Sequence, residues 1–141
     1  RFFHCEFFVL NEDKEGLGKK GDIFGLEVNM RPPGGYSPDM MNFANDINVY
    51  QIWANMVCYD KGYFDPEQRP YTCVYASRRR GSEYEHSHDD VFATYGQNIL
   101  MYEEMPAVLA GAMGDFAYMA RFTTEEEALA YVDYVLKKKV G

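Results

Sequence analysis

The sequence of 141 residues predicts an α+β fold, in which helices cover one side of an antiparallel sheet. Aromatic and β-compatible residues fill 2–10 and 23–31, and the polar connection between them contains three glycines, which indicates a hairpin. Apolar residues then recur at helical spacing from 49 to 57. The second half of the chain reads as strand, helix, strand, strand and helix.

The second strand of the hairpin has two different faces, because side chains alternate along a strand. One face carries Glu27, Asn29 and Arg31, and the two prolines that follow end the strand because they lack an N–H group. The opposite face is predicted to be entirely apolar and consists of Phe24, Leu26, Val28 and Met30.

The register of the hairpin brings two carboxylates together. Pairing the end of the first strand with the start of the second, residues 10 and 23, places Glu6 opposite Glu27 and His4 opposite Asn29. Because like charges directly opposite each other are destabilising, this arrangement predicts a divalent cation between them. Carboxylate and amide oxygens suit Mg²⁺. His4 is either a substrate or phosphate contact or a partly buried, hydrogen-bonded histidine.

The pattern Glu6 … Glu27-x-Asn29-x-Arg31, followed by a Pro/Gly turn and a helix, resembles the ATP-grasp superfamily, in particular biotin carboxylase and the carbamoyl-phosphate-synthase-like carboxylate–amine ligases. The resemblance implies that Glu6, Glu27 and Asn29 hold the Mg²⁺ (or Mn²⁺) ions that bridge the ATP phosphates. It assigns Arg31 to the reacting phosphate or carboxylate. The implied reaction activates a carboxylate or bicarbonate as an acyl phosphate, which an amine-type nucleophile then attacks.

The family takes its adenine pocket, its Gly-rich loop and two lysines from sequence upstream of the first Glu, whereas here the chain begins at Arg1. We therefore expect a C-terminal fragment, whose missing N-terminal half lies in the same or another chain. Residues 1–62 would form the C-terminal half of an ATP-grasp domain, and residues 63–141 a small βαββα subdomain. The alternative is a non-catalytic assembly or binding module that keeps this half-fold, and a homodimer is possible through exposed apolar surface.

The amino-acid composition excludes some classes of binding partner and favours one cellular compartment. The net charge of −8 argues against nucleic acid and anionic membrane surfaces, both of which attract clustered positive charge. Three cysteines without a CxxC spacing favour a reduced, cytoplasmic setting over a disulfide framework. No apolar run approaches the roughly 20 residues that a membrane span needs.

The apolar stripe in the middle of the chain predicts a helix that packs into a core. We expect Asn45 or Asp46 to cap its N-terminus and Gly62 to end it. The stripe consists of Val49, Ile52, Trp53, Met56 and Val57.

In the second half, strands are predicted at 71–77, 98–103 and 115–122, with a loop and a helical turn at 104–114. Ser87 and Asp90 are spaced as a capping box for a helix from His88 to Tyr95 that stops at Gly96. This cap is a better interpretation of the His86-x-His88 segment than a metal site. The last helix opens with capping-box spacings at Thr123 and Thr124, and its predicted apolar stripe is Ala128, Leu129, Val132, Val135 and Leu136.

Three consecutive arginines, Arg78–Arg80, stand out in an acidic chain. Guanidinium groups bind phosphate or carboxylate in a bidentate manner, so this run is a candidate anion site. Alternatively, the arginines pair with the acidic residues that follow, namely Glu83, Glu85, Asp89 and Asp90.

Overall fold

The computed structural model confirms the α+β prediction, with helices and two antiparallel sheets. It describes residues 2–65 and 67–139, so Arg1, Pro66 and residues 140–141 lie outside the described residues. The chain forms two compact units. The first unit contains residues 2–38 and 50–63, and the second contains 39–49 and 64–139.

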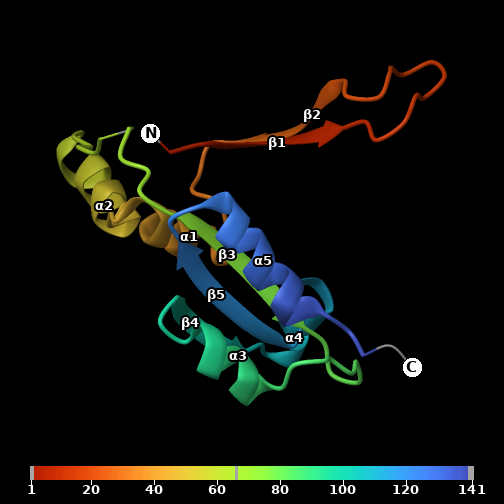
Figure 1. Cartoon of the computed structure of the whole chain (residues 1–141). Helices are drawn as coiled ribbons and strands as arrows, with labels where there is room; N and C mark the ends of the chain where they lie inside the picture. Colours follow the sequence, from red (N-terminus) through yellow and green to blue (C-terminus); the bar gives the residue numbers. More distant parts are fainter. Residues whose placement is uncertain (1, 66, 140–141) are drawn as a thin grey trace. The chain divides into compact units, whose positions relative to one another are not determined.

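The first unit contains the predicted hairpin, formed by the antiparallel pair β1 (His4–Val9) and β2 (Ile23–Asn29) (Figure 1). Glu6 pairs with Glu27 and His4 with Asn29, as predicted. The starting point of that prediction was wrong by one residue, because Ile23 pairs with Val9. A register shift between Glu6 and Phe7 compensates, since Phe7 pairs with Gly25 and leaves Leu26 as the extra residue of a β-bulge.

The bulge at Leu26 interrupts the strict alternation on which the prediction of one continuous apolar face rests. Apolar side chains of the hairpin are exposed in both strands. They are Phe7, Phe8 and Val9 of β1 and Ile23, Leu26 and Val28 of β2, each more than half exposed. The hairpin therefore presents carboxylates and apolar groups to solvent within the same short ribbon.

Helix α2 (Val49–Tyr59) forms where the sequence predicts it, but the prediction that its stripe belongs to a core is wrong. Only Val49 is buried, whereas Trp53 is 48% and Val57 is 67% exposed. Helical spacing shows that a face is amphipathic, but burial depends on what packs against that face.

The predicted ends of this helix were also wrong. The Val49 N–H donates to the Asn42 side chain at 2.7 Å, instead of to Asn45 or Asp46. At the other end, Asp60 takes a left-handed conformation with φ 52°, so the chain leaves the helix before Gly62. The N-terminal cap was not predicted because Asn42 lies in the preceding helix, α1 (Ser37–Asn45).

The second unit is built on a three-stranded antiparallel sheet in the order β3 (Thr72–Arg78), β5 (Phe116–Phe122), β4 (Ile99–Glu104). The connection from β4 to β5 contains the short helix α4 (Ala107–Met113). Figure 1 shows α5 (Glu125–Leu136) lying along β3 and β5, and α3 (His88–Tyr95) contacts α5.

The core of this unit lies between the sheet and the two helices. Its buried members are Ala76, Val91, Tyr118, Ala120, Phe122, Ala128, Tyr131 and Val135. The stripe predicted for α5 is partly wrong, because Leu129 is 56% exposed and Tyr131 is fully buried in its place. Burial raises the pKa of the Tyr131 hydroxyl, which keeps that group neutral in the core.

The N-caps of α3 and α5, unlike that of α2, were predicted correctly from capping-box spacings. Helix α3 has the predicted bounds, with Ser87 as N-cap and a reciprocal capping box between Ser87 and Asp90. Thr124 caps α5 by accepting from the Glu127 N–H at 3.2 Å. Each cap depends on residues three positions apart, so the sequence contains all the information needed.

Candidate functional site

The hairpin brings three potential metal ligands together. One ligand atom from each of His4, Glu6 and Glu27 lies within 4.8 Å of the other two. Among the described residues, this is the one group of three or more His, Cys, Asp or Glu side chains with such geometry. Pairing across β1 and β2 creates the cluster, because His4 and Glu6 are two residues apart on one strand and Glu27 lies opposite.

The orientation of His4 is fixed by hydrogen bonds on both ring nitrogens. Nδ1 lies 3.1 Å from the Arg31 carbonyl oxygen, which can only accept, so Nδ1 carries the proton. The Nε2 lone pair of the neutral ring then accepts from the Asn29 amide at 3.0 Å and lies 3.7 Å from a Glu6 carboxylate oxygen. Metal-binding histidines typically show this arrangement, in which one nitrogen donates to a carbonyl and the other faces the cluster.

Asn29 lies in the predicted cluster, with its amide nitrogen facing the other groups. It donates to a Glu27 carboxylate oxygen and to His4 Nε2. Coordination of a metal through Asn29 would use Oδ1 and so requires the amide to turn over, and the same movement would release the His4 Nε2 lone pair for the metal. In the observed orientation, the amide reduces the repulsion between the two carboxylates by hydrogen bonding to one of them.

Arg31 is placed beyond the end of β2, next to the cluster in sequence. Its Nη1 donates to the Pro32 carbonyl oxygen at 3.2 Å, and its own carbonyl accepts from His4. Within the described residues, no ion pair joins Arg31 to Glu6 or Glu27. Its backbone therefore orients His4, while its guanidinium is exposed and donates to the neighbouring Pro32 carbonyl.

The donor set fits a hard or borderline divalent cation. Two carboxylates supply the negative charge and oxygen ligands that Mg²⁺ and Mn²⁺ prefer, and an imidazole nitrogen favours Mn²⁺ over Mg²⁺. The Glu6 side chain is 52% exposed, whereas that of His4 is only 16% exposed. Such a site leaves open coordination positions for water or for a phosphate oxygen.

The His-x-His segment of the second unit is not part of a comparable cluster. The His86 ring stacks on Tyr134 with centroids 3.6 Å apart, and His88 Nδ1 lies 3.0 Å from the Tyr118 hydroxyl. His88 is also the first residue of α3, which agrees with the capping interpretation of this segment.

The arginine run is divided among three environments, and in the described residues none of the three forms an ion pair with the predicted acidic partners Glu83, Glu85, Asp89 and Asp90. Arg79 donates to the carbonyl oxygens of Ala110 and Gly111, at 3.0 and 3.1 Å. Arg80 forms ion pairs with Glu104 and Asp115. These partners are far away in sequence, so proximity along the chain could not identify them. Arg78 is buried, and its Nε donates to the Val135 carbonyl oxygen.

Comparison with protein-family models, with curated proteins and with solved structures gave no match to this chain. None of the helices in the described residues combines the length and the apolar character needed to cross a membrane.

Proposed function

We propose that this chain supplies the metal-binding part of the active site of an ATP-dependent ligase, related to biotin carboxylase and the carboxylate–amine ligases. The observation that carries the proposal is the direct pairing of Glu6 with Glu27 across the two strands, with Asn29 and His4 beside them. Two adjacent carboxylates are expected to repel, and a bound cation would turn this repulsion into attraction.

The proposed reaction activates a carboxylate or bicarbonate as an acyl phosphate, and an amine-type nucleophile then displaces the phosphate. A bound Mg²⁺ or Mn²⁺ would supply charge neutralisation for the phosphates. Glu6, Glu27 and His4 would hold the ion, and the exposed Arg31 guanidinium would neutralise the phosphoryl or carboxylate oxygens. Adenine and the remaining phosphate contacts would come from an N-terminal ATP-grasp half in the same or another chain, in the cytoplasm.

Metal binding is the first test. Binding confined to the native state stabilises it by RT ln(1 + [L]/Kd), about 2.7 kcal/mol at a hundredfold excess over Kd. Mn²⁺ and Mg²⁺ should therefore raise the melting temperature of the wild-type chain. Glu27→Gln should abolish the increase, because it removes one of the two charges, whereas Glu15→Gln, in the loop of the same hairpin, should retain it.

Turnover is the second part of this test. In the complete protein, Glu27→Gln should abolish carboxylate-dependent formation of ADP and phosphate while its circular dichroism spectrum remains that of the wild type. Retained turnover in a folded Glu27→Gln protein would show that the ligase assignment is wrong.

A second candidate function, a non-catalytic assembly module, is favoured by a separate observation. Apolar side chains of the hairpin are exposed in both strands, with Val28 at 69% and Ile23 at 67%. Exposed apolar surface on this scale is typical of protein–protein contacts. If the metals leave the melting temperature unchanged and the chain associates through this hairpin, the assembly function would replace the ligase.

A further inference from the structure

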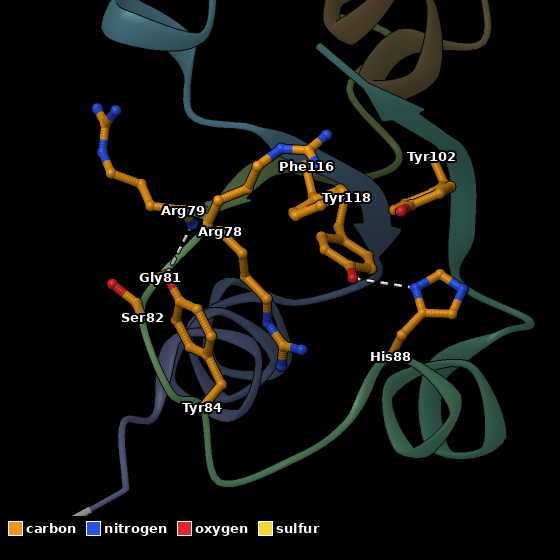
Figure 2. A pocket seen from close by; sticks show the side chains of 10 residues that line it. Arg78, Arg79, Gly81, Ser82, Tyr84, His88, Tyr102, Phe116 and Tyr118 are labelled. Carbon is orange, nitrogen blue, oxygen red and sulfur yellow. Dashed lines mark hydrogen bonds between the residues drawn. The ribbon is translucent and has the colours of Figure 1, made fainter.

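The second unit contains a cavity of about 320 Å³ that belongs to none of the functions proposed above. It lies beside the end of β3, and β4, β5 and the segment before α3 contribute to its walls (Figure 2). Aromatic and basic side chains line it, chiefly Arg78, Tyr84, His88, Tyr102, Phe116 and Tyr118.

Arg78 is the charged group of this cavity, and it is only 6% exposed. Its Nε donates to the Val135 carbonyl oxygen at 2.8 Å, near the C-terminus of α5. The guanidinium carbon lies 4.7 Å from the centre of the Tyr84 ring and 5.5 Å from that of Tyr118. Among the described residues, its Nη2 is buried and has no hydrogen-bond partner.

The charge of Arg78 has no carboxylate partner within ion-pair distance in the described part of the chain. The negative end of the α5 dipole and the two ring faces offset only part of a full positive charge. Burying a charge without an ionic partner is unfavourable, so a negative group in this cavity would stabilise the Arg78 guanidinium.

The neighbouring arginines do not share this role. Arg79 is engaged by the carbonyls at the end of α4, and Figure 2 shows its guanidinium pointing away from Arg78. Arg80 is neutralised by Glu104 and Asp115. Arg78 is therefore the one arginine of this run that is both buried and without an ion-pair partner in the described part of the chain, which matches a ligand with a single negative charge.

The remaining polar groups are hydroxyls and one imidazole. The Tyr84 hydroxyl accepts from the Arg79 N–H at 2.9 Å, so its own hydrogen is available to donate. His88 and Tyr118 are joined by a hydrogen bond of 3.0 Å across the cavity wall (Figure 2). The other walls are the rings of Tyr102 and Phe116, which suit a flat apolar group.

We propose that this cavity binds a small aromatic carboxylate. The carboxylate would accept hydrogen bonds from the Arg78 guanidinium and the Tyr84 hydroxyl, and the aromatic body of the ligand would stack among the remaining rings. A carboxylate is preferred to phosphate because it carries one charge and is attached to a flat apolar body that the rings of the cavity can stack on, while its two oxygens can accept from the planar guanidinium.

Benzoate titrated into the full 141-residue chain is the test, followed by NMR of ¹⁵N-arginine and ¹³C-histidine labels. We expect saturable shifts of the Arg78 Nε–H and His88 ring signals, with much smaller shifts from inorganic phosphate or acetate. Arg78→Met should weaken benzoate binding at least about tenfold, because it removes the charged hydrogen-bond donor that the carboxylate would pair with. Arg79→Met, whose side chain points away, should bind benzoate like the wild type.

Two results would overturn the proposal. One is the absence of a saturable benzoate shift at Arg78 in the wild-type chain, a measurement that does not depend on whether Arg78→Met folds. The other is phosphate binding as tightly as benzoate, which would assign the cavity to a different class of anion. Neither result affects the metal-binding test, because that test uses residues of the first unit.

Discussion

At the scale of single residues, His4 distinguishes this hairpin from a simple pair of carboxylates. Its Nδ1 is held by the Arg31 carbonyl, and its Nε2 faces the cluster. An imidazole ligand stabilises Mn²⁺ more than Mg²⁺, because Mg²⁺ prefers oxygen and keeps its waters. The site should therefore bind Mn²⁺ in preference to Mg²⁺.

His4→Gln removes the ring nitrogen but keeps a polar side chain. We expect Mn²⁺ affinity, measured by calorimetry, to fall at least about tenfold, with a smaller change for Mg²⁺. His86→Gln is the matched control, because the His86 ring stacks on Tyr134 in the other unit. An equal loss for both metals would show that His4 only supports the hairpin and does not bind the metal.

At the scale of elements, the N-terminus of α3 allows a sharp test of local capping. Ser87 donates to the Asp90 carboxylate from both its side chain and its backbone, and this lowers the pKa of Asp90. A carboxyl whose pKa is lowered by folding stabilises the protein above its unfolded pKa. That contribution is lost as the pH falls through the lower, folded value.

Ser87→Ala should destabilise the chain by about 1 kcal/mol in urea unfolding at neutral pH, because an N-cap is lost. The difference from wild type should shrink in strong acid, below the ordinary Asp value of 3.8, as Asp90 becomes protonated. Asp89→Asn, which alters a carboxylate in the same turn outside the capping box, should keep the wild-type dependence on pH. A pH-independent difference between Ser87→Ala and wild type would contradict this account of the cap.

At the scale of the whole molecule, the exposed apolar side chains of the β1–β2 hairpin predict that two copies of the chain associate. Burying a valine- or phenylalanine-sized side chain contributes about 1.5–3 kcal/mol. Removing two such side chains is therefore sufficient to shift the monomer–dimer equilibrium measurably. Phe8→Thr with Val28→Thr keeps β-compatible residues in both strands while removing much of the apolar surface. We expect this double variant to weaken homodimerisation at least about tenfold in sedimentation equilibrium.

Leu129→Gln is the control, because Leu129 is 56% exposed on α5 of the other unit and should leave association unchanged. A wild-type chain that sediments as a monomer at all concentrations would remove the homodimer from the proposal. The exposed apolar surface of the hairpin would then be expected to bind a different polypeptide, such as the proposed N-terminal ATP-grasp half.

The sequence by itself determined the class of fold, the bounds of α3 and the pairing of Glu6 with Glu27. These features depend on alternation, on helical spacing and on caps formed within a few residues, which are local properties of a chain. The predicted pairing of Glu6 with Glu27 was correct although Ile23 pairs with Val9 instead of Leu10, because the bulge at Leu26 compensates for the difference of one residue. No sequence signal identified that bulge.

Only the tertiary structure decided which groups are buried and which partners they meet. It exposed Trp53, which the helical stripe had assigned to a core, and it buried Arg78 beside Tyr84 and Tyr118. It also showed that the Arg31 carbonyl, 27 residues away, orients the His4 ring toward the carboxylates. Burial and long-range hydrogen bonds depend on surfaces that meet only after folding, so the spacing of residues along the chain does not contain them.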